Sequence, residues 1–431
     1  MHVFSLSLLI LFALVGAHVP KAFSLLYLAL ALTWVMSWRL DPMSLPPLPA
    51  GRLKAFRVVQ ILVLLFSCFY PLAMLHFGFW QLSGRQLLDV VGAVVLPSGM
   101  LWWGFYWARR DLRVLVGCLL AYSIGGLVFL LAALTKTWGL SWFAPHADPG
   151  TLLLAWGAEA SMNVRSIEQN GILSVVLAPV ALWLFARRRV LIAAVMLLLA
   201  ALGLLAVLPL DHGRLWIVSL ALALLPWAYR ALVSLWHRLD GIGLGLWQRM
   251  ALPLVTVVCS FVALRHSWVR LCDERFGMYA QALHHWPQLI AGGRVLKYEA
   301  LQCDGLTRVV VSVNGSPLVA NGIVTTVFVH SVPLDVVAAV GLWAALPLLL
   351  TLGIALFFLA RFLFLWLGPA SLAWRSLWLH LFWCFLAVLV PQWLFQPLIY
   401  ADGLLYYVSY AALGALIVLP VPVGIGSRRM G

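Results

Sequence analysis

The sequence predicts an all-α integral membrane protein with about twelve transmembrane helices and a large folded loop between the ninth and tenth helices. Of its 431 residues, 64% are hydrophobic and only 10% are charged, whereas a soluble domain carries about 25% charged residues. The apolar runs are long and continuous, as spanning helices of about 20 residues require. Strands of a porin-type barrel would alternate apolar and polar residues. Both a soluble enzyme and a porin-type barrel are therefore excluded.

Twelve apolar runs, each bounded by charged or turn residues, are the predicted spans. They lie at about 3–18, 21–37, 56–76, 87–107, 112–134, 171–186, 190–209, 214–230, 250–264, 334–360, 373–394 and 402–422. The first run has no basic segment before it, and a second apolar run follows almost at once. We therefore interpret the first run as a membrane span rather than as a signal peptide.

The basic residues indicate which loops face the cytoplasm. The net charge is +14, from 28 Lys and Arg against 14 Asp and Glu, and retention of basic loops inside accounts for much of this excess without nucleic acid as a partner. With the N-terminus inside, the short cytoplasmic loops and the C-terminal end hold seventeen Lys and Arg residues, among them Arg187, Arg188 and Arg189. The short outer loops hold three. Both termini are therefore expected in the cytoplasm.

Three regions follow from these spans. Residues 1–264 hold transmembrane helices 1–9 with a long outer loop at about 135–170, residues 265–333 form a larger outer loop, and residues 334–431 hold helices 10–12. Long ordered loops in a compact protein usually carry function. Function is therefore expected on the outer face.

The loop at 265–333 is predicted to be a small folded cap. RFGMYAQALHHW, at 275–286, predicts an amphipathic helix, and RVVVSVNGSPLV, at 308–319, places an Asn-Gly pair between two β-branched runs, as in a two-residue hairpin turn. Cys272 and Cys303 are the two cysteines outside the apolar runs. We predict a disulfide between them, which would stabilise the cap by about 3 to 4 kcal/mol.

Several outer cations are candidates for chemistry. Arg214 lies at the outer end of the eighth span beside His212, and Arg165 and Arg275 lie in the two long loops. Each also fits an interfacial anchor or a solvated side chain. His330 lies in an apolar stretch that leads into the tenth span, where a packed histidine is the alternative reading. Because Arg binds phosphate through a planar charged fork, together they favour a lipid-linked pyrophosphate as ligand.

Other chemistries have no support in the sequence. The chain contains no Walker loop, no GxGxxG and no GxSxG motif, and no Cys/His cluster of the kind that binds a metal. The outer carboxylates Glu159, Glu168 and Asp335 show no spacing that defines a glycosidase-like pair. We expect no metal and no cofactor.

Three stretches resemble the O-antigen ligases and the related O-antigen polymerases. Residues 171–225 resemble the central helices with an Arg-containing motif at the start of the next span, which maps to Arg214. RFGMYAQALHHWPQLIAGG, at 275–293, resembles a loop segment with a leading Arg and closing glycines, mapping to Arg275. HSVPLDVVAAVGLWAALPLLL, at 330–350, resembles the His-Asn-x-x-Leu signature before a Gly-punctuated helix, with Ser331 in place of the Asn.

The resemblance implies a metal-independent inverting glycosyltransferase in the inner membrane of a Gram-negative bacterium. It would transfer O-antigen polysaccharide from undecaprenyl pyrophosphate to the lipid A core oligosaccharide on the periplasmic side and so complete lipopolysaccharide. Arg214 and Arg275 would neutralise the pyrophosphate, and His330 would take the proton of the acceptor hydroxyl or hydrogen-bond the pyrophosphate. We expect Arg165, His212 and Asp335 to contribute to substrate binding.

Two alternatives remain open. A polymerase would use a second lipid-linked repeat as acceptor, and composition does not separate it from a ligase. A flippase or other transporter of lipid-linked oligosaccharide would show paired repeats and charges near the membrane midplane. The predicted spans are almost free of charge, apart from Asp89 near Arg85, which favours an enzyme.

Overall fold

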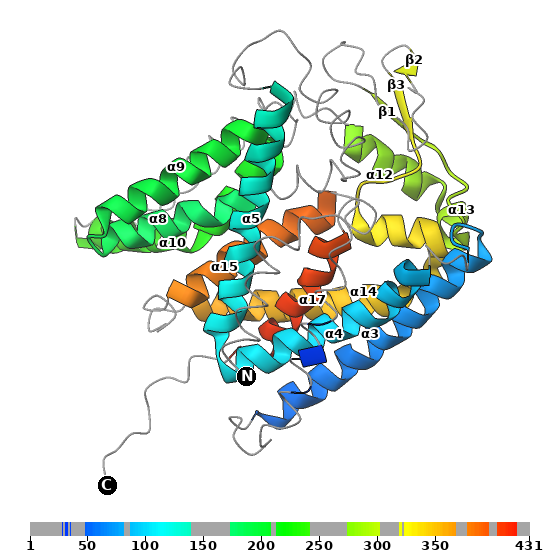
Figure 1. Ribbon diagram of the computed structural model, residues 1–431, viewed down its shortest axis with the longest axis horizontal. Coiled ribbons are helices and arrows are strands. Elements are labelled where there is room, and N and C mark those ends of the chain that lie inside the picture. The colour runs from blue at the N-terminus through cyan, green and yellow to red at the C-terminus, as the bar shows by residue number, and fades with distance from the viewer. Residues whose placement is uncertain are drawn as a thin grey trace.

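The computed structural model describes residues 48–81, 87–138, 173–207, 213–241, 274–301, 319–320, 323–367, 377–395 and 403–419, with residues 28, 31, 32 and 35. The described chain is predominantly helical (Figure 1). Its helices are α3 (Ala50–His76), α4 (Leu87–Arg110), α5 (Leu112–Trp138), α8 (Leu177–Ala186) after a short 3-10 turn η3 (Leu173–Val176), α9 (Val190–Val207), α10 (Gly213–Gly241), α12 (Glu274–His284), α13 (Trp286–Ala291), α14 (Val332–Leu367), α15 (Leu377–Phe395) and α17 (Gly403–Val418).

Five of the described helices, α3, α4, α10, α14 and α15, are long and apolar enough to cross a membrane. Shorter apolar helices accompany them, including α9 and α17. Many large apolar side chains on these helices face outward, as expected where lipid rather than water is the solvent. These are the features of an all-α membrane protein.

The predicted spans between 56 and 230 and between 334 and 422 fall on described helices. The structure differs from the predicted runs in two places. The eighth run was expected to end at Arg230, but α10 continues to Gly241. The tenth run was expected as one helix, but α14 is interrupted at Gly341. The runs at 3–18 and 250–264, and nearly all of 21–37, lie outside the described residues, so the count of twelve stays a prediction.

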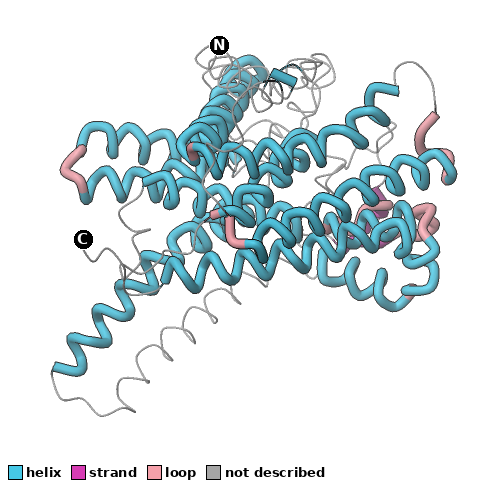
Figure 2. Tube along the Cα trace, turned by 90° about the horizontal axis from the view of Figure 1, so that it is seen from below, coloured by secondary structure: helices cyan, strands magenta, loops and turns pink. Residues whose placement is uncertain are grey.

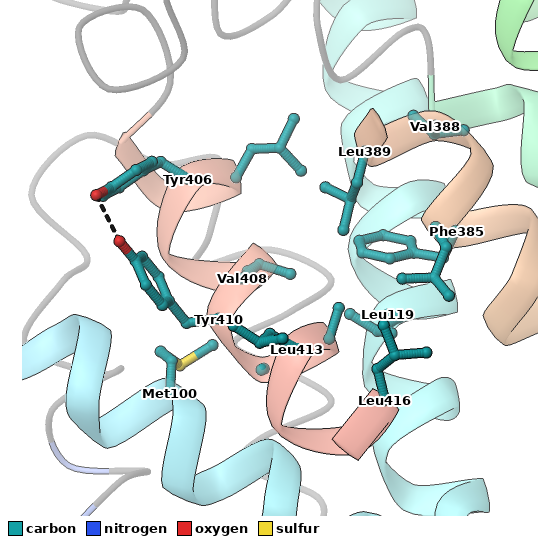
Figure 3. Close-up of a cluster of buried hydrophobic side chains, with 14 of the residues drawn as sticks. Met100, Leu119, Phe385, Val388, Leu389, Tyr406, Val408, Tyr410, Leu413 and Leu416 are labelled. Atoms are coloured by element: carbon teal, nitrogen blue, oxygen red, sulfur yellow. Dashed lines mark hydrogen bonds between the residues drawn. The ribbon is translucent and has the colours of Figure 1, made fainter. Parts of the chain in front are cut away.

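The helix core is held by close backbone packing and by aromatic side chains. A Cβ on Gly414 of α17 would lie 2.8 Å from the backbone nitrogen of Phe105 in α4, so glycine lets these two helices approach each other. Figure 3 shows Tyr406 and Tyr410 of α17 joined through their hydroxyls at 2.7 Å, near side chains from α4, α5 and α15. Within the membrane this pairing satisfies two buried phenols that water does not reach.

A buried arginine joins the two ends of the described chain. The guanidinium of Arg52, at the start of α3, donates to the carbonyl oxygens of Val418, at 2.7 Å, and Leu419 at the end of α17. The last carbonyl groups of a helix receive no hydrogen bond from N–H groups of the same helix, and they attract cations. Arg52 therefore caps α17.

The cap region contains helix and sheet. Strands β1 (Tyr298–Leu301), β2 (Val319–Ala320) and β3 (Ile323–Thr326) form an antiparallel sheet in the order β1-β3-β2, and α12 packs on β1. Strands appear in magenta close to helices in Figure 2. The amphipathic helix predicted at 275–286 is confirmed as α12 and the start of α13. The predicted turn at Asn314 and Gly315, and both cysteines of the predicted disulfide, lie outside the described residues.

Candidate functional site at the start of α14

The turn before α14 carries His330, the histidine singled out in the sequence. α14 begins at Val332, and the N–H of Asp335 donates to the carbonyl oxygen of Ser331 at 2.7 Å, as in a first helical turn. His330 has a φ of 60°, a left-handed conformation that residues other than glycine adopt at a cost. Strained positions of this kind collect at functional sites. The backbone here must be held by other groups.

The carboxylate of Asp335 is one of these groups. It is 2% exposed, and its two oxygens accept the N–H groups of Val329, at 2.6 Å, and Ser331, at 3.0 Å. These N–H groups flank His330 on both sides. A buried side chain that accepts two backbone N–H groups holds both of them in place, because either N–H left unpaired would cost free energy. Asp335 therefore positions the histidine turn.

Tyr279 of α12 also contacts this turn. Its hydroxyl lies 3.2 Å from the carbonyl oxygen of His330 and 3.0 Å from that of Leu394, near the end of α15. The hydroxyl donates toward these two carbonyls. The cap helix α12 and the helix α15 are thus linked at the residue predicted to carry the chemistry.

A loop of the cap packs against α14 where a glycine breaks the helix. Gly341 has φ 81° and ψ 162° and interrupts the helix. The carbonyl oxygens of Ala339 and Ala338 accept instead the N–H groups of Gly293, at 2.9 Å, and Arg294, at 2.8 Å. A Cβ on Gly292 would lie 2.5 Å from the nitrogen of Gly341. Only glycine permits so close an approach of the two backbones.

Arg294 brings a positive charge to the site. Its guanidinium lies 4.7 Å from the ring centroid of Phe79, between α3 and α4, and 5.2 Å from that of Phe328. Such distances give favourable cation–π contacts. Its charge also acts on the carboxylate of Asp335. Arg294 lies in the predicted cap, but its role could not be predicted from the sequence, because its aromatic partners are distant in the chain.

Tyr298 of β1 completes the buried side of the site. It is fully enclosed, and its hydroxyl makes no hydrogen bond with the described residues. Burial, and then the charge of Asp335, raise the pKa of Tyr298 to about 12. The phenol is therefore neutral at physiological pH and offers a proton donor beside a carboxylate.

An apolar cavity of about 400 Å³ reaches the start of α14 at Pro333. It runs between α14, α15 and α17 and is bounded near the site by Pro333 and Leu394. Its few polar lining residues are Thr351, Ser409 and Tyr410. Pockets of this size accommodate small molecules or parts of them, and the lining suits hydrocarbon.

The other predicted site residues are described in part or not at all. Arg214 lies in the first turn of α10 and Arg275 in the first turn of α12. The structure describes the backbone of these two residues but not their side chains. Arg165 and His212 lie outside the described residues. His284 is exposed at the end of α12. Within the described ranges, no three His, Cys, Asp or Glu residues gather as metal ligands.

Comparisons with known proteins give no relative. No family model matches the chain. No curated protein and no solved structure matches it either.

Proposed function

We propose that this protein is a membrane glycosyltransferase of the O-antigen ligase type. It moves O-antigen polysaccharide from undecaprenyl pyrophosphate to the lipid A core oligosaccharide at the periplasmic face of a Gram-negative inner membrane. The supporting observation is that two of the three resembling stretches meet in space. Gly292 of one packs against the helix break at Gly341 of the other, and Tyr279 of the first donates to the carbonyl oxygen of His330 in the second.

The proposed reaction needs a base, a pyrophosphate site and a place for the lipid. The acceptor hydroxyl oxygen attacks the anomeric carbon while the bond from that carbon to the pyrophosphate oxygen breaks, which inverts the configuration. His330 takes the hydroxyl proton, since histidine is the side chain that most often serves as a general base. Arg214 and Arg275 neutralise the leaving pyrophosphate, and Arg165 and His212 contribute to substrate binding. Asp335 acts as a positioning residue through the backbone of the histidine turn.

The cavity supports a lipid-linked donor. Pro333 borders it three residues after His330, so a polyprenyl chain lying in the cavity would bring its pyrophosphate end toward the histidine turn. The cavity walls belong mostly to helices apolar enough to cross a membrane. A soluble sugar nucleotide is polar and would bind poorly in a cavity lined by hydrocarbon.

Within the described residues, the break in α14 is a feature that favours a transporter. Transporters bind substrates and ions at discontinuous helices, where unwound carbonyls are free to coordinate. Here the carbonyls of Ala338 and Ala339 are already occupied by the N–H groups of Arg294 and Gly293. The break therefore fits a fixed joint between the cap and α14 better than an ion site.

Reconstitution tests the proposal. The purified protein is given lipid-linked O-antigen together with either core lipid or a second lipid-linked repeat. Elongated core lipid is the expected product. Elongation of the lipid-linked repeat alone would identify a polymerase, and movement of the donor across vesicles without any transfer would identify a transporter.

His330 is tested with two substitutions because its backbone is left-handed. His330→Asn suits this conformation, since Asn tolerates it better than most residues, and it removes the base. We expect a loss of transfer of about 100- to 10,000-fold with unchanged folding. His330→Ala should lose as much activity and also some stability. His284→Ala is the control with full activity expected, and EDTA should leave transfer unchanged. Full activity in His330→Asn would contradict the role.

A further inference from the structure

A tight turn of three arginines separates α8 from α9. Arg187, Arg188 and Arg189 are all exposed. In Figure 1, α8 and α9 lie side by side, away from α12, α13 and the strands. The turn is thus remote from the site at the start of α14.

The backbone N–H groups of the three arginines donate to carbonyl oxygens in the last turn of α8. The N–H groups of Arg187 and Arg189 donate to the carbonyl oxygen of Leu184, and that of Arg188 donates to Phe185, at 2.9 to 3.0 Å. This is a Schellman motif, in which the residue after the helix adopts a left-handed conformation and is usually glycine. Arg188 occupies that position with φ 59°. An arginine in this position costs free energy that glycine would not.

No acidic side chain of the described residues pairs with the three guanidinium groups. Residues 173–207 contain neither Asp nor Glu. Among the described residues, the guanidinium of Arg187 contacts the ring of Trp183, whose centroid lies 5.0 Å away. Three uncompensated charges at one turn attract an anion, and guanidinium binds phosphate through two parallel hydrogen bonds.

Exposed apolar side chains border the turn on both helices. Phe185 is 63% exposed, Val190 57% and Leu191 79%. A soluble phosphate would gain nothing from these surfaces, whereas acyl chains lie against them. We propose that the α8–α9 turn is a binding site for an anionic phospholipid such as phosphatidylglycerol, with the phosphate on the arginines and the chains along α8 and α9. This site is independent of the proposed transferase activity.

Arg188→Gly separates binding from folding, because glycine suits the left-handed position. The full-length protein in neutral detergent is titrated with phosphatidylglycerol or phosphatidylcholine, and bound lipid is counted by native mass spectrometry. We expect Arg188→Gly to bind phosphatidylglycerol about fivefold more weakly, as for one basic residue at an anionic surface, with an unfolding temperature equal to or above that of the wild type. Replacing Arg187 and Arg189 by Gln as well should weaken binding by roughly a hundredfold.

Arg113→Gln, at another exposed arginine, is the matched control and should bind as the wild type does. The proposal is overturned if Arg188→Gly and the triple variant keep wild-type binding, or if phosphatidylcholine binds as well as phosphatidylglycerol. It is also overturned if inorganic phosphate displaces the lipid at equal concentration, because the site would then take free phosphate. If the triple variant does not fold, Arg188→Gly alone decides. No glycan substrate enters the assay, so failure here leaves the transferase proposal untouched.

Discussion

Single buried polar groups set the geometry of the histidine turn, and Asp335 is the most directly testable of them. In Asp335→Asn one oxygen still accepts an N–H from Val329 or Ser331, but the amide NH2 now faces the other donor. Leaving one buried N–H unpaired costs about 1 to 3 kcal/mol. We expect a lower unfolding temperature and reduced glycosyl transfer. Asp111→Asn is the control, because Asp111 is exposed and accepts the N–H of Arg113, a role that Asn fills equally well.

The enclosed phenol of Tyr298 makes stability depend on alkaline pH. Its pKa is raised to about 12 by burial and by Asp335, whereas the unfolded phenol ionises near pH 10. Folding thus opposes ionisation, so the stabilisation is complete below about pH 10 and is lost as the pH rises toward 12. Tyr298→Phe should match or exceed the wild type at pH 8 and lose less stability between pH 9 and 11. Equal losses in thermal unfolding of the two proteins would contradict this assignment.

The sequence identified part of this site for a clear reason. His330 stands out because a titratable ring within an apolar stretch is unusual in the sequence itself. Arg294 and Tyr279 do not stand out, since both lie in the polar cap where charged and aromatic residues are common. Their partners, Phe79 and Leu394, are distant in the chain. Only the folded arrangement reveals these contacts.

At the scale of elements, the break in α14 makes a prediction about two glycines of one helix. Gly341→Ala would force a Cβ to 3.0 Å from the carbonyl oxygen of Ile290 at a φ of 81°, which costs about 1 to 3 kcal/mol. Gly353→Ala meets nothing within 4 Å and should be neutral or stabilising, because alanine favours helix. The two unfolding temperatures in detergent provide the test. Equal unfolding temperatures would mean that a side chain at position 341 does not strain the contact between the cap and α14.

Hydrophobic periodicity predicts where these helices lie but not how they are interrupted or extended. α3, α4 and α15 coincide with apolar runs within several residues. α10 extends past Arg230 because the following residues still favour helix, and a helix leaving an apolar environment needs no further apolar run. Gly341 looks like any small residue in an apolar run. The helix break at Gly341 depends on contact with the loop at Gly292, which the sequence of α14 alone does not show.

At the scale of the whole molecule, contacts between distant segments give the bundle its order. Arg52 caps α17 across 366 residues of sequence, and Gly292 meets Gly341 at the joint between the cap and α14. Local sequence patterns carry no information about such pairings. Charge distribution does act over the whole chain, however, and it predicts the orientation of the protein in the membrane.

The predicted topology has twelve spans, both termini in the cytoplasm and residues 265–333 in the periplasm. It rests on seventeen basic residues at cytoplasmic positions against three in short outer loops, a bias that retains the richer side in the cytoplasm. Reporter fusions after Gly293 and at Gly431 should therefore report opposite sides of the membrane. Both reporters on one side would require an even number of crossings between Gly293 and the end of the chain. That outcome would remove either the cap or the C-terminus from its proposed compartment, whatever the chemistry at His330.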